Sequence, residues 1–186
     1  MEEQAWFSDY FERYRQTLFE QTNYKDLIQI KEMFLKANKS GNKIIFAGNG
    51  GSAAMASHCT VDLTKNAGIR AINFNEADLI TCFANDYGYE NWISKAIQFY
   101  GKTDDVIVLI SSSGTSKNIV NAIETSLSMQ LKVITFSGFG PDNLIRKKGH
   151  VNCWVDSNAY NIVEMTHHIW LLSIIDMIIG SAEYSA

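Results

Sequence analysis

Apolar residues recur every three or four positions through the first forty residues. A first stretch carries Trp6, Phe7, Tyr10, Phe11, Tyr14 and Leu18, and a second carries Leu27, Ile30, Met33 and Phe34. This spacing places the apolar side chains on one face of a helix. The pattern therefore predicts a helical arm over residues 1–40.

The pattern then changes to five short apolar runs, separated by segments with helical spacing. The runs cover residues 43–47, 71–74, 106–110, 132–136 and 151–155. A short, continuously apolar run is typical of a strand buried on both faces. Strands that alternate with helices form a parallel sheet with helices on both sides. We expect one α/β domain over residues 1–186, with the arm at 1–40 followed by a three-layer αβα sandwich at 41–186.

Composition narrows the class of protein. The chain has 186 residues and a net charge of −4, and its lysines and arginines form no stripe that would follow nucleic acid. The most apolar segment, residues 169–179, is shorter than a membrane span, and Ser173 and Asp176 interrupt it, so we expect a core helix there. We therefore expect no nucleic acid and no membrane as partners.

Cysteine usage and the first residues indicate the compartment. Cys59, Cys82 and Cys153 are odd in number and widely spaced, which favours free thiols over disulfides and over a cysteine zinc site. The first residues lack the basic and apolar regions of an export signal. Both observations favour a cytoplasmic protein.

Two loops that follow predicted strands have the residues of an anion site. The first, the glycine loop, is Gly48-Asn49-Gly50-Gly51-Ser52, and the second, the serine loop at residues 111–116, reads Ser-Ser-Ser-Gly-Thr-Ser. Ligands of open parallel sheets bind at the carboxyl ends of the strands. Free backbone N–H groups, hydroxyls and a close-approaching glycine backbone together suit a phosphate. The alternative is a polar turn followed by an ordinary serine or threonine N-cap.

The glycine loop also allows a dinucleotide interpretation. Gly48, Gly50 and Ala53 match the G-x-G-x-x-A fingerprint after a strand, and Glu76 follows the next strand, where a ribose-binding acid would stand. The serine loop has no role in such a site, so the phosphate interpretation ranks higher. A Walker-type loop is excluded because no Gly-Lys-Ser/Thr follows. We expect no nucleotide cofactor.

With these loops, the chain resembles the sugar isomerase (SIS) family, and within it the phosphoheptose isomerases. The resemblance is carried by the helical arm, the two loops, and residues 85–89 and 132–135. It implies a five-stranded flavodoxin-like sheet and a homotetramer with active sites between subunits. It also implies an isomerase that converts sedoheptulose 7-phosphate to D-glycero-D-manno-heptose 7-phosphate through an enediol, for lipopolysaccharide or capsule.

The resemblance assigns binding roles by position. The phosphate would be held by Ser52, Ser111, Ser112, Ser113 and Ser116. Asn49 and Gly50 would line the sugar, and Asp86 would contact its hydroxyls.

The same resemblance implies metal ligands on two helices. His58 and Asp62, four residues apart, match a His–Glu pair of the family that ligates metal and supplies the base. On the last helix, the family's Gln and His ligands align with Val163 and Leu171, and a substrate-binding Asp aligns with Tyr160. Two ligand positions are therefore apolar in this chain.

His167 stands four residues from both apolar replacements and so shares their helix face. We expect Asp62 to act as the base and His167 as the acid. Zn²⁺ is a further expectation, held by His58 and Asp62 with His167 or Glu164. The competing hypothesis is a non-catalytic phosphosugar-binding or regulatory protein, of the type that associates with the bacterial replication initiator.

Overall fold

The computed structural model describes residues 2–184, so residues 1, 185 and 186 of the predicted domain lie outside the described residues. The helices are α1 (Glu3–Arg15), α2 (Tyr24–Lys39), α3 (Gly51–Lys65), α4 (Ala77–Tyr87), α5 (Trp92–Tyr100), α6 (Lys117–Ser128) and α7 (Tyr160–Ile179), with a π-helical segment η1 (Gln16–Glu20) after α1. The strands are β1 (Ile44–Ala47), β2 (Ala71–Asn73), β3 (Val106–Ser111), β4 (Lys132–Ser137) and β5 (Val151–Trp154).

The five strands form one parallel sheet in the order β2-β1-β3-β4-β5. β1 and β3 are buried along their whole length, as expected of strands covered on both faces. Alternate residues enter opposite cores: Ile44 and Phe46 pack on one side, and Ile45 and Ala47 pack on the other. The prediction of a five-stranded, flavodoxin-like α/β sandwich is confirmed.

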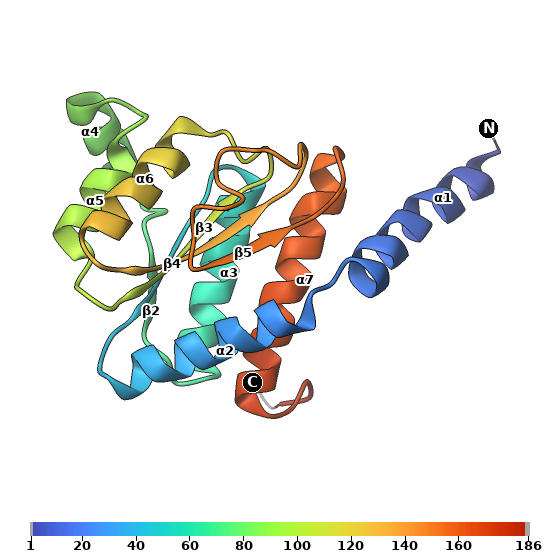
Figure 1. The fold of residues 1–186 in the computed structure, drawn as a ribbon, viewed down its shortest axis with the longest axis horizontal. Helices are drawn as coiled ribbons and strands as arrows, with labels where there is room; N and C mark the ends of the chain where they lie inside the picture. The colour runs from blue at the N-terminus through green and yellow to red at the C-terminus, as the bar shows by residue number, and fades with distance from the viewer. Residues whose placement is uncertain (1, 185–186) are drawn as a thin grey trace.

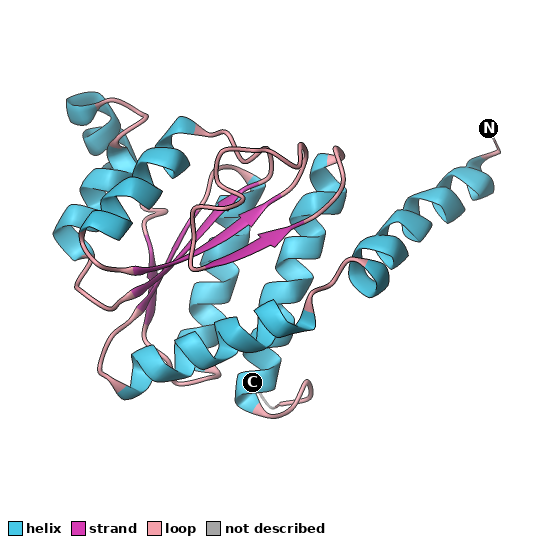
Figure 2. Cartoon of the chain, viewed as in Figure 1, coloured by secondary structure: helices cyan, strands magenta, loops and turns pink. Residues whose placement is uncertain are grey.

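Helices cover the two faces separately. α2, α3 and α7 pack on one face, while α5 and α6 pack on the other with α4 beside α5 (Figure 1). The strands therefore lie in the middle layer, between two helical layers (Figure 2). Because every connection returns to the amino end of the next strand, the loops that begin α3 and α6 meet at the carboxyl edge of the sheet.

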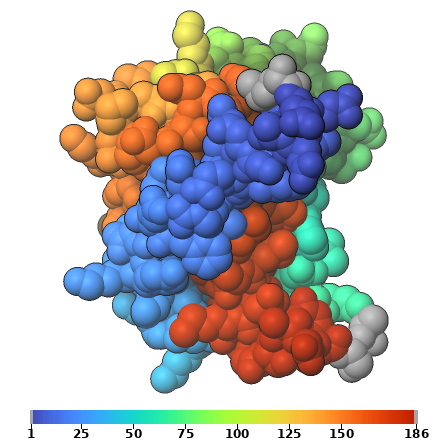
Figure 3. Space-filling model, turned by 90° about the vertical axis from the view of Figure 1, so that its right-hand side faces the viewer, coloured from blue at the N-terminus to red at the C-terminus, as the bar shows by residue number. Residues whose placement is uncertain are grey.

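The predicted N-terminal arm is only partly an arm. α2 belongs to the sandwich, and its Ile30 and Phe34 are fully buried in the core. α1 has no buried residue and projects from the body (Figure 1). A buried hydrogen bond of 2.8 Å between the Thr17 and Thr166 hydroxyls fixes the base of the arm to α7. In the view from this side α1 stands in front, and α2 packs against α7 (Figure 3). The sandwich therefore begins with α2, before the predicted boundary at residue 41.

α7 is the longest helix, and by length and hydropathy alone it would suffice to cross a membrane. In the fold it instead packs against the sheet. Ile162, Val163, Leu171 and Ile174 are buried in the core. Burial of this face makes α7 a core helix, as predicted for residues 169–179.

Candidate functional site

A cavity of about 270 Å³ opens at the carboxyl edge of the sheet, beyond β1 and β3. It is lined by Asn49, Gly50, Gly51, Ser52, Ile110, Ser111, Ser112, Ser113, Ser116, Tyr160 and Glu164. The glycine loop, the serine loop and the start of α7 therefore form one site. Of the residues expected to hold phosphate and sugar, all except Asp86 line this cavity.

Two helices begin at the cavity. α3 follows β1 through the glycine loop, and α6 follows β3 through the serine loop. Neither N-cap residue, Gly50 or Ser116, forms a side-chain capping bond. Gly50 has a φ of 54°, which only glycine adopts without strain at this ψ of −122°. In α3 the N–H groups of Ser52 and Ala53 donate to the carbonyl oxygens of Asn49 and Gly50, which leaves the Gly51 N–H for a ligand, within residues 2–184. In α6 the N–H groups ahead of Ile119 are left in the same way, and both helices direct a positive dipole end at the cavity.

The serine hydroxyls are arranged around the same cavity. Ser111 donates from Oγ to Ser116 Oγ over 3.2 Å, and Ser113 Oγ accepts from the Thr115 hydroxyl over 3.1 Å. Ser112 is only 5% exposed, and its Oγ has no hydrogen-bond partner among the described residues. A buried hydroxyl without a partner is costly, so its position favours a ligand that completes the bond.

An amide pair braces the glycine loop. Asn49 and Asn118 exchange two hydrogen bonds of 3.1 and 2.9 Å between their side chains. The Tyr89 hydroxyl also donates to Asn49 Oδ1 over 3.1 Å. Sequence reasoning missed Asn118 and Tyr89, although Tyr89 lies in one of the segments that carried the family resemblance. Both residues hold Asn49 in place beside the cavity.

Asp86 and Tyr160 take positions that were not foreseen. Asp86 is exposed at the end of α4, where its Oδ1 accepts a hydrogen bond from the Asn85 amide, and it does not line the cavity. Tyr160 does line the cavity, and its ring packs edge-on against Phe139 at a centroid distance of 4.8 Å. Within this chain, Tyr160 rather than Asp86 is placed to meet a bound sugar.

Glu164 is the one charged side chain that lines the cavity, within residues 2–184. Its carboxylate lies over Gly51, where a β-carbon would stand only 2.2 Å from Glu164 Oε2. Burial raises the pKa of Glu164 above its usual value. The nearby Ser112 hydroxyl opposes this rise in the pKa of Glu164. The contact is nevertheless too poor in distance or angle to count as a hydrogen bond, so Ser112 Oγ has no partner within residues 2–184.

A second polar cluster lies along the contact between α3 and α7. His58 Nε2 is 3.3 Å from Asp62 Oδ2, and His58 Nδ1 is 3.1 Å from His168 Nε2. Burial lowers the pKa of His168, the neighbouring His58 lowers it further, and Asp62 opposes both. The two histidines share a hydrogen bond, and Asp62 lies at ion-pair distance from His58, so the three side chains form one row that ends at His168.

His167 does not join this cluster, contrary to the expectation that it would project toward His58 and Asp62. It is fully buried, its Nε2 lies 3.0 Å from the Ser137 carbonyl oxygen, and its ring packs edge-on against Phe136. Burial lowers the pKa of His167 to about 4, so the ring is neutral near pH 7. His167 is a core residue and cannot reach the expected substrate from this position.

The faces of α7 explain this correction. Val163, His167 and Leu171 are all completely buried and face the sheet. The face toward α3 carries Glu164, which contacts Gly51, and His168, which meets His58. Glu164 and His168 follow Val163 and His167 by one residue each, and one residue along a helix turns a side chain by about 100°.

The expected zinc ligands do not converge. Glu164 lies at the cavity and His167 in the core, while His58 and Asp62 lie together on α3. Within residues 2–184, no group of three His, Cys, Asp or Glu side chains is arranged to hold a metal ion. The expected set of four does not fit a single metal ion.

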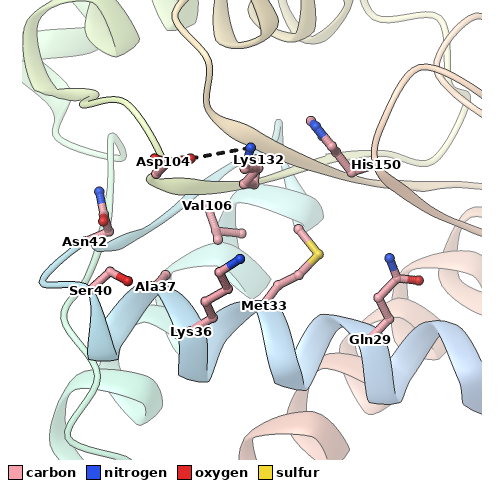
Figure 4. A pocket seen from close by; sticks show the side chains of 10 residues that line it. All are labelled: Gln29, Met33, Lys36, Ala37, Ser40, Asn42, Asp104, Val106, Lys132 and His150. Carbon is pink, nitrogen blue, oxygen red and sulfur yellow. Dashed lines mark ion pairs between the residues drawn. The ribbon is translucent and has the colours of Figure 1, made fainter.

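A larger cavity, of about 380 Å³, lies at the opposite, amino edge of the sheet. Figure 4 shows it between α2 and the first residues of β3 and β4, with Met33 and Lys36 reaching up from α2. Lys132 at its rim pairs with Asp104 over 3.4 Å. None of the expected site residues lines this cavity. Its size alone therefore does not identify the site.

Comparison with known proteins agrees with this geometry. The SIS domain family model matches residues 7–138. The phosphoheptose isomerase of Colwellia psychrerythraea is 35% identical over 154 residues, covering 78% of this chain and 79% of its own. The structure of the phosphoheptose isomerase from Neisseria gonorrhoeae aligns with a TM-score of 0.84 and 25% identity, covering 94% of this chain and 96% of that one. The Francisella tularensis phosphoheptose isomerase has the same fold, with a TM-score of 0.86, 24% identity, and coverage of 97% and 100%.

Proposed function

The chain belongs to the SIS domain family, and on this basis we propose that it isomerises a phosphorylated sugar, sedoheptulose 7-phosphate, to D-glycero-D-manno-heptose 7-phosphate. The observation that carries the proposal is the buried Ser112 hydroxyl, which has no partner within residues 2–184 and lines the cavity where α3 and α6 begin. Hydroxyls and helix N-termini aimed at one space are the donors that a phosphate requires.

The side chains that follow the cavity along α3 and α7 give the substrate a direction. Gly51 and His58 are seven residues apart on one face of α3, which separates them by about 10 Å along the helix. Glu164 and His168 follow the same direction, one turn apart on α7. A sugar phosphate extended in this direction would place its phosphate at the serine loop and its carbonyl end near His58 and His168.

Proton transfer is assigned in this proposal to the cluster of His58, Asp62 and His168. Isomerisation through an enediol requires a base that removes the proton beside the carbonyl and an acid that protonates the carbonyl oxygen. Asp62 is the proposed base, as the sequence predicts. His168 replaces His167 as the proposed acid, because His168 is the α7 histidine joined to His58.

Zinc remains part of the proposal in an altered form. Its ligands would be His58 and His168, whose facing nitrogens are 3.1 Å apart. Asp62, which is 3.3 Å from the other nitrogen of His58, would orient that ring, as carboxylates beside zinc-bound histidines do. A zinc ion, when bound, supplies a Lewis acid for a carbonyl oxygen.

The proposal includes a cytoplasmic homotetramer with sites between subunits, serving lipopolysaccharide or capsule synthesis. Support for assembly comes from α1, where Trp6, Phe7 and Phe11 are 48%, 55% and 62% exposed. A contiguous exposed aromatic surface of this kind marks an interface. Light scattering measures the mass of the assembly and tests this part of the proposal. The Phe7→Ser and Phe11→Ser variants should have a lower mass than the unaltered protein, while each subunit stays folded.

Activity on sedoheptulose 7-phosphate, with and without EDTA and then with zinc restored, tests the function. Turnover lost with EDTA and regained with zinc supports both the isomerase and its metal. Turnover that is unchanged by EDTA rejects the proposed metal but supports the isomerase activity. Absence of turnover, with sugar phosphate still bound in calorimetry, rejects the isomerase and favours a regulatory phosphosugar-binding protein.

A further inference from the structure

The cavity that suits a phosphate has an unexpected charge. Serine, glycine, asparagine, tyrosine and isoleucine residues line it, and its one charged side chain, within the described part of the chain, is the carboxylate of Glu164. No lysine or arginine lines it. A phosphate bound here would therefore meet a like charge and no cationic side chain, which opposes binding.

The Glu164 carboxylate lies at the amino end of α3. It lies against Gly51, the first residue of α3, so closely that a β-carbon at Gly51 would overlap Oε2. The N–H groups of Ser52 and Ala53 donate to the carbonyl oxygens of Asn49 and Gly50, so of the first N–H groups of α3 the Gly51 N–H is left for an anion, within residues 2–184. Glu164 thus stands in the cavity that a bound phosphate would enter.

A phosphate and this carboxylate cannot occupy the same position. Glu164 is half-buried at the rim of the cavity, and its long side chain has other rotamers available. One direction leads along α7 toward His168, one turn away on the same face. A displaced carboxylate would then lie beside the sugar, where it can accept hydrogen bonds from hydroxyl groups.

We propose that Glu164 is an internal anion that fills the phosphate position in the free protein and is displaced by the phosphate group of the substrate. It acts as a specificity residue: inorganic phosphate must displace the carboxylate and gains nothing in return, whereas a sugar phosphate offers hydroxyls to the displaced group. This inference rests on the proposed phosphosugar function and adds discrimination against free phosphate to it.

Calorimetric titration with inorganic phosphate tests the inference. Glu164→Gln keeps the shape and removes the charge, so phosphate should bind at least about tenfold tighter than to the unaltered protein. The affinity for the sugar phosphate should rise less, so the preference for sugar phosphate over inorganic phosphate should fall. Glu124→Gln is the matched control, because Glu124 loses the same charge at an exposed site paired with Lys148, and its affinities should stay unchanged.

Glu164→Ala is a second variant, which lacks both the charge and the amide group that glutamine would introduce. It should also bind phosphate more tightly than the unaltered protein. Circular dichroism checks that each variant is folded. Phosphate binding that is equal or weaker in both Glu164 variants overturns the inference, while sugar phosphate binding by the unaltered protein would leave the proposed function standing. If neither the unaltered protein nor any variant binds phosphate or sugar phosphate, both the inference and the proposed function are overturned.

Discussion

The two edges of the sheet treat their polar groups in opposite ways. At the amino edge, Asp105 is 1% exposed and fully engaged. It accepts hydrogen bonds from the backbone of Lys43 and Lys102 and from the Asn42 amide, and it pairs with the Lys43 ammonium group. At the carboxyl edge, Ser112 is equally buried and has no partner within residues 2–184.

This difference separates structural polar groups from those that await a ligand. Buried groups satisfied by the chain itself contribute to folding, and removing one partner strands the other. Groups left unsatisfied cost stability, so they are kept where a ligand completes them. The larger cavity lies at the satisfied edge and the smaller one at the unsatisfied edge. Four other buried polar atoms also lack a partner within residues 2–184, and their residues do not line the smaller cavity: Trp92 Nε1, Ser94 Oγ, Trp154 Nε1 and His167 Nδ1. An unsatisfied group therefore indicates function where it also lines a cavity, as Ser112 does.

The largest expected effect is the difference in turnover between substitutions of His168, beside α3, and of His150, at the amino edge of the sheet. His168→Asn removes the end of the Asp62–His58–His168 chain, so turnover should fall by roughly 10²-fold or more while sugar phosphate affinity is kept. His150→Asn is the control, because its Nδ1 accepts only the Val133 N–H at the amino edge. Steady-state kinetics and calorimetry measure both. Equal turnover in the two variants would remove His168 from the proposed mechanism.

Asp105→Asn should cause the largest loss of folding stability. The substitution leaves the Lys43 ammonium without its buried partner, at a cost of about 3 kcal/mol in the free energy of unfolding. Urea denaturation measures it, and sugar phosphate affinity of the folded fraction should not change.

The same carboxylate predicts an acid limit. Burial alone would raise the pKa of Asp105, but hydrogen bonds from Lys43, Lys102 and Asn42 outweigh it and hold the pKa below its usual value. A lowered carboxyl pKa contributes stability that is present above about pH 4 and is lost as the pH falls through the folded-state value. Below about pH 4 the unaltered protein should lose this contribution, so its advantage in stability over Asp105→Asn should shrink as the pH falls.

His167 predicts a separate loss of stability at a higher pH. Burial lowers the pKa of His167 to about 4, whereas an unfolded histidine titrates near 6.5. The unfolded chain therefore binds a proton first, and stability should fall by about 3 kcal/mol as the pH drops from about 6.5 to about 4. His167→Gln, which keeps a donor for the Ser137 carbonyl oxygen, should flatten this slope in urea denaturation curves. A slope that survives the substitution would assign it to other groups.

The contrast also shows what the amino-acid pattern can and cannot predict. Continuous apolar runs located all five strands, and hydroxyls and glycines after β1 and β3 located the cavity, because both signals are local. The active face of α7 was not predictable. The helix is apolar on nearly every side, so no periodicity tells which face meets the sheet. Sequence reasoning therefore selected His167, which lies in the core, whereas His168 is the histidine that faces α3 and meets His58.

Long-range contacts were equally invisible in the sequence. Glu164 meets Gly51 across more than a hundred residues, and Asn118 meets Asn49 across sixty-nine. Such pairs arise only when separate loops converge at one edge of the sheet. Asp86 lies away from the cavity of its own chain, and this distance also depends on a long-range feature, the way α4 is set against α5.

The smallest effect should come from single buried serines, and it distinguishes the two kinds of polar group directly. Ser112→Ala removes a hydroxyl that has no partner within residues 2–184, so thermal stability should be unchanged or slightly raised. Sugar phosphate affinity should fall by about tenfold, the usual value of one hydrogen bond to a charged group. Ser126→Ala is the matched control, because Ser126 is fully buried but bonded to the Ala122 carbonyl oxygen over 2.6 Å. It should lose a little stability and no affinity. If Ser112→Ala instead lowers the melting temperature and leaves binding intact, Ser112 is structural, and the carboxyl edge no longer differs from the amino edge in the way described.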